Sequence, residues 1–174
     1  SEAVKNYLDA AGVNCKILVA DGPTMTAQAA ATRLKVPLET IIKSIVFNGQ
    51  DGSPVIAILT GDKRVSKAKL SALTGAKVKI ASADSARVLT GFEVGSMPPL
   101  GHTSRIPTVI DQKVMSFSKV YGGAGTPDAL IELNPRDIAR LAEAKIANIC
   151  ELEEDNGDKS RSSSQAQPEK LGAP

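Results

Sequence analysis

A chain of 174 residues, 42% hydrophobic and 23% charged, is expected to form one globular domain that buries a core without disulfides or metal. The net charge of +2 is too small either to require or to exclude a nucleic-acid partner. Aromatic residues make up only 3% and there is no Trp, so a stacking platform for single-stranded nucleic acid is not expected.

Cysteine, histidine and hydropathy patterns argue against three further classes. Cys15 and Cys150 are far apart and form no C-x-x-C motif, which argues against a disulfide framework. His102 is the only histidine, so a histidine-based zinc site lacks ligands. No apolar segment approaches the ~18 residues that span a bilayer. We therefore expect a cytoplasmic protein with no metal, no cofactor and no membrane contact.

The first half of the chain alternates short helical and strand patterns. In order, the spacing of apolar residues predicts a helix over 4–11, a strand over 16–20, an alanine-rich helix capped by Thr24 or Thr26 and ending near 34, and strands over 41–47 and 55–59. The turn Asn48-Gly49-Gln50-Asp51-Gly52 is typical of a hairpin. The last two strands are therefore expected to pair antiparallel.

The second half continues the mixture. It predicts a helix over 66–73 between Ser66 and Gly75, a strand over 78–80, a helix over 84–89, strands over 108–111 and 129–133, a helix from Asn134 to about 144, and a closing segment over 146–152. Because helices and strands intermix around an antiparallel hairpin, the sequence favours a mixed or antiparallel sheet over a doubly wound one.

Lys43 stands out because it interrupts an otherwise apolar strand, Ile41-Ile42-Lys43-Ser44-Ile45-Val46-Phe47. Burying an ammonium group is costly, so such a lysine either extends its head to water or serves a site. On a strand, Lys43 shares a face with Ile45 and Phe47, while Ser44 faces the other way. A lysine in that place can hold and polarise a carbonyl or phosphate group.

Two glycine-rich segments are candidate partners for Lys43. The segment Gly95-Ser96-Met97-Pro98-Pro99-Leu100-Gly101-His102 is stiffened by its prolines, and its backbone N–H groups can converge on an oxyanion; an ordinary surface crossover is the alternative. The second segment, Gly122-Gly123-Ala124-Gly125, is treated as a loop. It is not a G-x-G-x-x-G motif, and no P-loop occurs, which disfavours a nucleotide cofactor.

A basic stretch follows the hairpin and contains Lys63, Arg64, Lys67, Lys69, Lys77 and Lys79. Such a stretch can follow a phosphate backbone, and it can equally be the solvated face of a helix. The spacing leaves both interpretations open.

An ordered set of short motifs carries a family resemblance. In sequence order, the motifs are Lys43-Ser44, Gly61-Asp62-Lys63-Arg64-Val65, Lys67-Ala68-Lys69-Leu70, Thr90-Gly91-Phe92, the loop Gly95–His102, Val109-Ile110-Asp111 and Gly125-Thr126-Pro127. Together they resemble the YbaK-like superfamily of prolyl-tRNA-synthetase-associated editing domains. The resemblance covers about residues 1–152. It implies an α+β fold with a mixed, largely antiparallel, barrel-like sheet and surrounding helices.

The resemblance also implies an activity and a site. The activity is metal-independent hydrolysis of mischarged tRNA, mainly tRNA(Pro) carrying Ala, Ser, Thr or Cys. Lys43 matches the residue on which activity depends most, and the predicted substrate-binding residues are Thr26, Ser44, Gly95, Ser96, Met97, Pro98, Pro99, Leu100, Gly101, His102, Asp111, Gly122, Gly123 and Gly125. Tyr121 replaces the serine of cysteine-specific members and Ser44 the asparagine of alanine-specific ones. The substrate amino acid therefore stays open.

Other functions and partners remain open from the sequence. A non-catalytic tRNA- or synthetase-binding module is the alternative to the aminoacyl-tRNA deacylase, and an esterase acting on small esters is a third candidate. Residues 153–174 are acidic and then rich in serine, which predicts a disordered tail or linker. Such a tail would suit a tether to prolyl-tRNA synthetase, in cis or in trans.

Overall fold

The computed structural model describes residues 2–152, and the predicted tail over 153–174 lies outside them. Within the described residues the strands are β1 (Lys16–Val19), β2 (Ile42–Gly49), β3 (Pro54–Thr60), β4 (Val78–Ile80), β5 (Thr108–Asp111), β6 (Val120–Gly123), β7 (Ala129–Leu133) and β8 (Lys145–Ala147). The helices are α1 (Glu2–Ala10), α2 (Ala27–Leu34), α3 (Lys67–Thr74), α4 (Ala83–Thr90) and α5 (Pro135–Leu141), with 3-10 turns η1 (Leu38–Thr40) and η2 (Gln112–Ser116).

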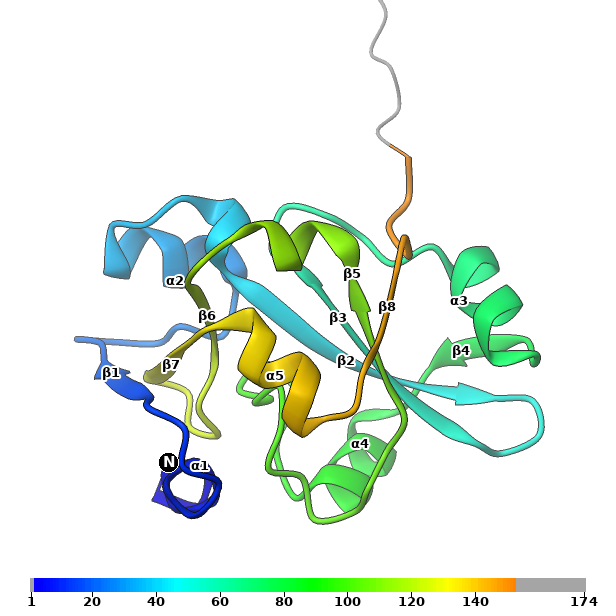
Figure 1. Cartoon of the computed structure of the whole chain (residues 1–174), viewed down its shortest axis with the longest axis horizontal. Coiled ribbons are helices and arrows are strands. Elements are labelled where there is room, and N and C mark those ends of the chain that lie inside the picture. The colour runs from blue at the N-terminus through cyan, green and yellow to red at the C-terminus, as the bar shows by residue number, and fades with distance from the viewer. Residues whose placement is uncertain (1, 153–174) are drawn as a thin grey trace, which may run out of the picture.

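The strands form two open sheets, and helices surround them (Figure 1). One sheet has the order β4-β2-β3-β5-β8, and the other has the order β1-β7-β6. The β2–β3, β2–β4, β1–β7 and β6–β7 pairs are antiparallel, whereas β3–β5 and β5–β8 are parallel. The mixed, largely antiparallel α+β prediction is confirmed. The expected barrel-like closure is not, because within residues 2–152 the only backbone pairing between the two sheets is a single bridge between Ile41 and Tyr121.

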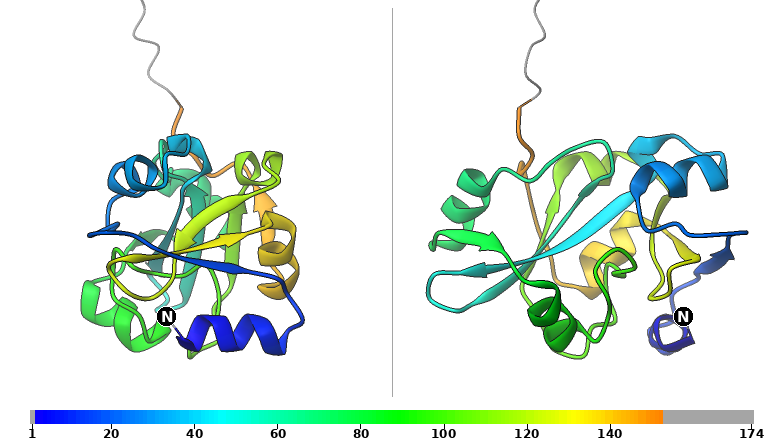
Figure 2. Two further views of the ribbon diagram at one scale, coloured as in Figure 1. Left: turned by 90° about the vertical axis from the view of Figure 1, so that its left-hand side faces the viewer. Right: turned by 180° about the vertical axis from the view of Figure 1, so that it is seen from behind.

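The predicted hairpin forms, and β2 and β3 pair antiparallel as expected. Lys43 pairs with Leu59 and Asn48 with Pro54, and the Gly49 N–H donates a hydrogen bond of 2.8 Å to the Ser53 carbonyl across the turn. Helix ends also follow the sequence signals: Ser66 caps α3, Asn134 caps α5, and Gly75 ends α3 in a left-handed conformation. Seen from the two sides in Figures 1 and 2, α3 and β4 lie at the end of the molecule opposite α1 and β1.

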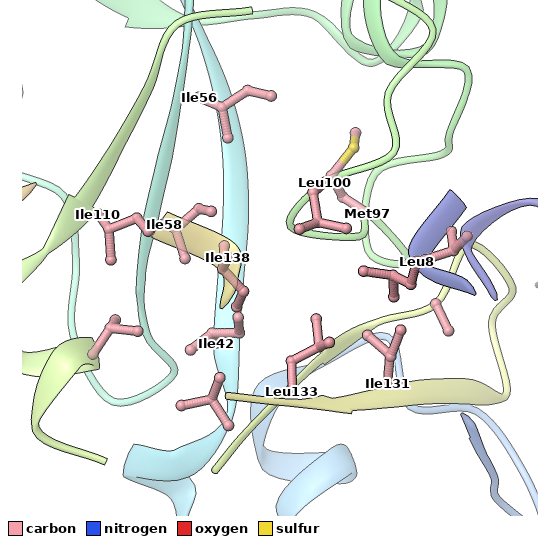
Figure 3. Close-up of a cluster of buried hydrophobic side chains, with 14 of the residues drawn as sticks. Leu8, Ile42, Ile56, Ile58, Met97, Leu100, Ile110, Ile131, Leu133 and Ile138 are labelled. Carbon is pink, nitrogen blue, oxygen red and sulfur yellow. The ribbon is translucent and has the colours of Figure 1, made fainter. Parts of the chain in front are cut away.

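Two hydrophobic clusters cover the two faces of the larger sheet. The larger cluster contains Ile42, Ile56, Ile58 and Ile110, and the smaller contains Phe47, Leu59 and Leu70. Figure 3 shows Met97 and Leu100 pointing into the larger cluster from the glycine- and proline-containing loop. That loop is therefore fixed by two buried side chains. No helix within residues 2–152 is long and apolar enough to cross a membrane.

Candidate functional site

Six of the predicted site residues surround one cavity of about 220 Å³. They come from the start of α2, from β2, from the 95–97 loop and from β6, and they are Thr26, Lys43, Ser44, Gly95, Met97 and Gly123. The remaining wall is mostly apolar and includes Ala27, Ala30, Ile41, Ile42, Ile45, Ala129 and Leu130. Cavities that bind drug-sized ligands measure roughly 300–1,000 Å³. This cavity therefore suits a small chemical group.

Lys43 is a half-buried ammonium group at this cavity. Its Nζ donates a hydrogen bond of 2.6 Å to the carbonyl of Lys63, and no carboxylate of the described residues is ion-paired with it. Burial lowers the pKa of Lys43 below its ordinary value, and the nearby charge of Arg64 lowers it further, against an opposing effect of Asp62. One proton of the ammonium is thus used to fix its position, and the others are available to a ligand.

The segment Gly95–Gly101 contributes backbone to the cavity. Gly95 has a φ of +93°, a backbone conformation that residues with a Cβ rarely adopt, so glycine is strongly favoured there. In the described part of the chain, the N–H groups of Gly95 and Met97 donate to no acceptor, whereas the Ser96 N–H donates to the Glu93 carbonyl. Two backbone donors at the cavity are therefore available to a ligand.

Four of the predicted residues, from the end of this loop and just after it, do not line the cavity at Lys43. Pro99, Leu100, Gly101 and His102 line a separate cavity of about 370 Å³. The His102 Nε2 lies 2.8 Å from the carbonyl of Pro98 and donates to it, and the ring packs edge-on against Phe92. Burial lowers the pKa of His102, while the hydrogen bond to Pro98 raises it. The hydrogen bond from His102 therefore fixes the backbone of the loop at Pro98.

The glycine-rich segment Gly122–Gly125 contacts the loop through Ser96, Met97 and Pro99. Ser96 is buried, and its carbonyl accepts a hydrogen bond of 2.9 Å from the N–H of Gly125. A Cβ at Gly123 would lie 2.6 Å from the Met97 carbonyl oxygen, and one at Gly122 would lie 3.3 Å from the Pro99 Cδ. The segment treated as a loop in the sequence therefore forms part of β6, against which the 96–97 backbone packs directly.

Asp111 lies away from the cavity and supports Lys43 indirectly. This buried carboxylate accepts hydrogen bonds from the N–H groups of Lys113 and Ile149, at 3.1 and 2.9 Å. The Ile149 carbonyl in turn accepts from the Ser66 N–H at 2.7 Å, next to the segment that provides the Lys63 carbonyl. Asp111 thus anchors the chain segment against which the Lys43 ammonium is fixed.

Cys150 belongs to the same buried region. Burial and the adjacent Asp111 carboxylate raise the pKa of its thiol to about 12, so the thiol stays protonated and is not a nucleophile at neutral pH. Both cysteines are free, as expected from their spacing. Within residues 2–152, no group of three or more His, Cys, Asp or Glu side chains is arranged to hold a metal ion.

The chain matches a known family over most of its length. The profile of the aminoacyl-tRNA editing domain matches residues 21–141, which include β2, the 95–101 loop and the glycine-rich strand β6. The chain belongs to the aminoacyl-tRNA editing domain family.

Relatives of this editing domain are both free-standing and parts of larger enzymes. It is 27% identical over 126 residues to EbsC of Enterococcus faecalis, named as a candidate Cys-tRNA(Pro)/Cys-tRNA(Cys) deacylase; the match covers 72% of this chain and 77% of EbsC. It is 31% identical over 133 residues to the proline–tRNA ligase of Lactobacillus gasseri, covering 74% of this chain but only 23% of the ligase.

A solved structure has the same fold as this editing domain. It is described as a candidate trans-editing enzyme for prolyl-tRNA synthetase, with 30% sequence identity and a TM-score of 0.81. The match covers 86% of this chain and 96% of the other. The family resemblance that the sequence motifs indicate is confirmed.

Sequence reasoning missed several residues at the cavity. Met25 and Val94 lie at its rim and are both about half exposed, although they are large and apolar. The carbonyl of Lys63, which fixes Lys43, was also not predicted to serve the site. The identity of a side chain does not reveal a role for the backbone carbonyl of the same residue. The sequence did contain one indication, because Lys63 lies within Gly61–Val65, one of the motifs that carry the family resemblance.

Proposed function

We propose that this editing domain hydrolyses the ester bond of tRNA charged with a wrong, small amino acid. One observation carries the proposal: the Lys43 ammonium, half-buried and without a carboxylate partner in the described residues, lies at a small cavity beside two free backbone donors. Such groups stabilise negative charge that develops on oxygen. Hydrolysis of an ester passes through an intermediate with that charge.

The proposed reaction needs few protein groups. Water attacks the ester carbonyl, and the carbonyl oxygen becomes an oxyanion held by Lys43 and by the N–H groups of Gly95 and Met97. The C–O bond to the ribose then breaks, the ribose oxygen takes up the proton that the attacking water gives up, and the products are the free amino acid and uncharged tRNA. We assign no protein base and no metal to this reaction. A hydroxyl of the terminal ribose positions the water.

The cavity supports a small amino acid as substrate. Its volume of about 220 Å³ and its walls of Ala27, Ala30 and Ile42 leave space for a short side chain. Ser44 adds a hydroxyl that has no hydrogen-bond partner among the described residues. Ala, Ser, Thr and Cys are therefore the candidate amino acids. Each differs from its neighbours by a methyl, hydroxyl or thiol group, worth about 1–3 kcal/mol in such a pocket.

We further propose tRNA(Pro) as the substrate and prolyl-tRNA synthetase as the associated enzyme, acting in the cytoplasm where tRNA is charged. The similarity to part of a proline–tRNA ligase and to a candidate trans-editing enzyme supports this assignment.

Deacylation of tRNA(Pro) charged with Ala, Cys, Ser, Thr or Pro tests the proposal. The wild type should clear at least one non-cognate ester and spare Pro-tRNA, and Lys43→Ala should lose that activity. Lys16→Ala is the matched control, because Lys16 is an exposed lysine of β1 that does not line the cavity. Full activity of Lys43→Ala would refute the assignment. Binding of tRNA without hydrolysis of any ester would indicate a non-catalytic binding module.

A further inference from the structure

The cations of this domain are distributed unevenly. Most exposed lysines and arginines outside residues 54–83 have a carboxylate partner within the described residues, namely Lys5, Arg33, Arg87, Arg105, Lys113, Lys119 and Arg140. Between 54 and 83, Asp62 is the only acidic residue, and it stands among Lys63, Arg64, Lys67, Lys69, Lys77 and Lys79. Positive charge is therefore concentrated on one segment.

The six cations of this segment do not act alike. Lys69 is tied down, since its Nζ donates to the Asn148 Oδ1 and to the Cys150 carbonyl. Arg64 and Lys67 are exposed and form no ion pair with any described residue. Lys67 also occupies the first position of α3, where the helix dipole disfavours a cation. No ion pair within the described residues therefore stabilises the charges of Arg64 and Lys67.

Arg64 lies close to Lys43, and Lys67 follows three residues later at the start of α3. The chain runs from the Lys63 carbonyl, which binds the Lys43 ammonium, through Arg64 and directly into α3. Arg64 is close enough to Lys43 for its charge to lower the pKa of that lysine. The segment is also held firmly, because the Glu151 N–H donates to the Arg64 carbonyl at 2.8 Å and Val65 bridges to Cys150. The backbone that carries these charges is therefore held next to the carbonyl that binds Lys43.

We propose that Lys63, Arg64 and Lys67 form the docking surface for the phosphate backbone of the tRNA acceptor end whose ester enters the cavity. This inference rests on the proposed function and names the surface that presents the substrate to it. A polyanion provides the negative charge that Arg64 and Lys67 lack within the described protein. A run of phosphates along this segment would bring the terminal ribose to Lys43.

Lys79, in the same basic segment, provides a control for Lys67. Val78 packs in the hydrophobic cluster that contains Leu70 of α3. Because side chains alternate along a strand, Lys79 projects from the opposite face of the sheet. Lys79 is exposed and has no ion-pair partner among the described residues, as is true of Lys67. Lys67→Gln and Lys79→Gln therefore remove the same charge from the two faces of one sheet.

Binding of uncharged tRNA(Pro) transcript, measured by fluorescence anisotropy from 50 to 200 mM salt, tests the surface. Each lost phosphate contact should reduce the slope of log K against log salt by about 0.7–0.9. Over that fourfold change in salt, the affinity of Lys67→Gln or Arg64→Gln should therefore fall about threefold less than that of the wild type. Lys79→Gln should keep the wild-type slope. In deacylation, Lys67→Gln should raise KM and leave kcat unchanged.

Two results would overturn the surface. The first is an equal loss of slope in Lys67→Gln and Lys79→Gln, which would indicate non-specific attraction by net charge. The second is an unchanged slope in both Arg64→Gln and Lys67→Gln. The binding assay needs no hydrolysis, so it separates this inference from the proposed function. A wild type that binds tRNA through this surface but hydrolyses no ester would refute the activity and leave the docking surface standing.

Discussion

Replacing Gly123 by Ala should displace the 95–101 loop without unfolding the domain. Gly123 has no positive φ, so its backbone accepts a side chain, but the added Cβ would lie 2.6 Å from the Met97 carbonyl oxygen and 2.7 Å from two Ser96 backbone atoms. Ordinary contact begins at 3.4 Å, so the loop must move by about 0.8 Å. Backbone atoms cannot rotate away as the end of a side chain can.

A movement of that size should impair catalysis more than folding. A 1 Å misplacement of catalytic groups can cost about 100-fold in rate, which corresponds to about 2.7 kcal/mol of transition-state stabilisation. We therefore expect kcat for the non-cognate ester to fall about 100-fold in Gly123→Ala. The affinity for uncharged tRNA should stay unchanged, because the basic surface lies on another segment. Overpacking should lower the free energy of unfolding by about 1–3 kcal/mol.

The adjacent glycine is the control for this experiment. A Cβ at Gly122 would meet side-chain atoms of Ile42 at 3.2 Å and of Pro99 at 3.3 Å, and these can yield by a few tenths of an ångström. Gly122→Ala should therefore keep kcat within about threefold of the wild type. The reasoning fails if Gly123→Ala is folded and fully active. It fails equally if both variants lose the same activity, because backbone contact would then not be the cause.

Two further predictions concern Lys43 and its support. Because the ammonium form of Lys43 is required and its pKa is lowered, kcat should fall with rising pH earlier than it would for a lysine of ordinary pKa. Arg64→Gln removes a charge that lowers this pKa, so it should move the decline in kcat to higher pH. A move of the decline to lower pH would contradict the mechanism. Asp111→Ala leaves two backbone donors without an acceptor and should lower the free energy of unfolding by about 2–4 kcal/mol in urea denaturation. Asp111→Asn keeps an acceptor and should restore part of that loss, with kcat following; no difference between the Ala and Asn variants would count against the support role.

The sequence predicts those parts of the fold that have local signals. The hairpin at 48–52, the Ser66 cap and the Asn134–Pro135 start of α5 all form as expected, because each depends on neighbouring residues. β6 was missed. Its Val-Tyr-Gly-Gly sequence has a weak strand pattern, since glycine is disfavoured in strands unless another backbone approaches closely. That approach, by residues 96 and 97, comes from a segment distant in sequence.

The candidate site shows the same difference between local signals, which the sequence contains, and contacts between distant segments, which it does not. Lys43 and Gly95 could be identified because a lysine in an apolar strand and a glycine flanking a proline pair are unusual locally. The roles of His102 and Asp111 could not, because each depends on a partner that only the tertiary structure provides. His102 donates to a carbonyl of the loop, and Asp111 accepts from the segment after β8. Two polar residues that the sequence predicted at the substrate site thus do not line the cavity at Lys43 but support the segments around it.

Because surrounding residues fix Lys43 and the loop, the cavity itself needs few polar side chains. Lys43 is fixed by one carbonyl, and the loop is fixed on one side by Gly125 and on the other by His102. The groups that face a ligand are then a single ammonium and backbone N–H donors, which do not distinguish one amino acid from another, and the hydroxyl of Ser44. Selectivity must therefore come from Ser44 and the apolar wall, so substitutions such as Ile42→Ala should change which ester is cleaved more than how fast the preferred ester reacts.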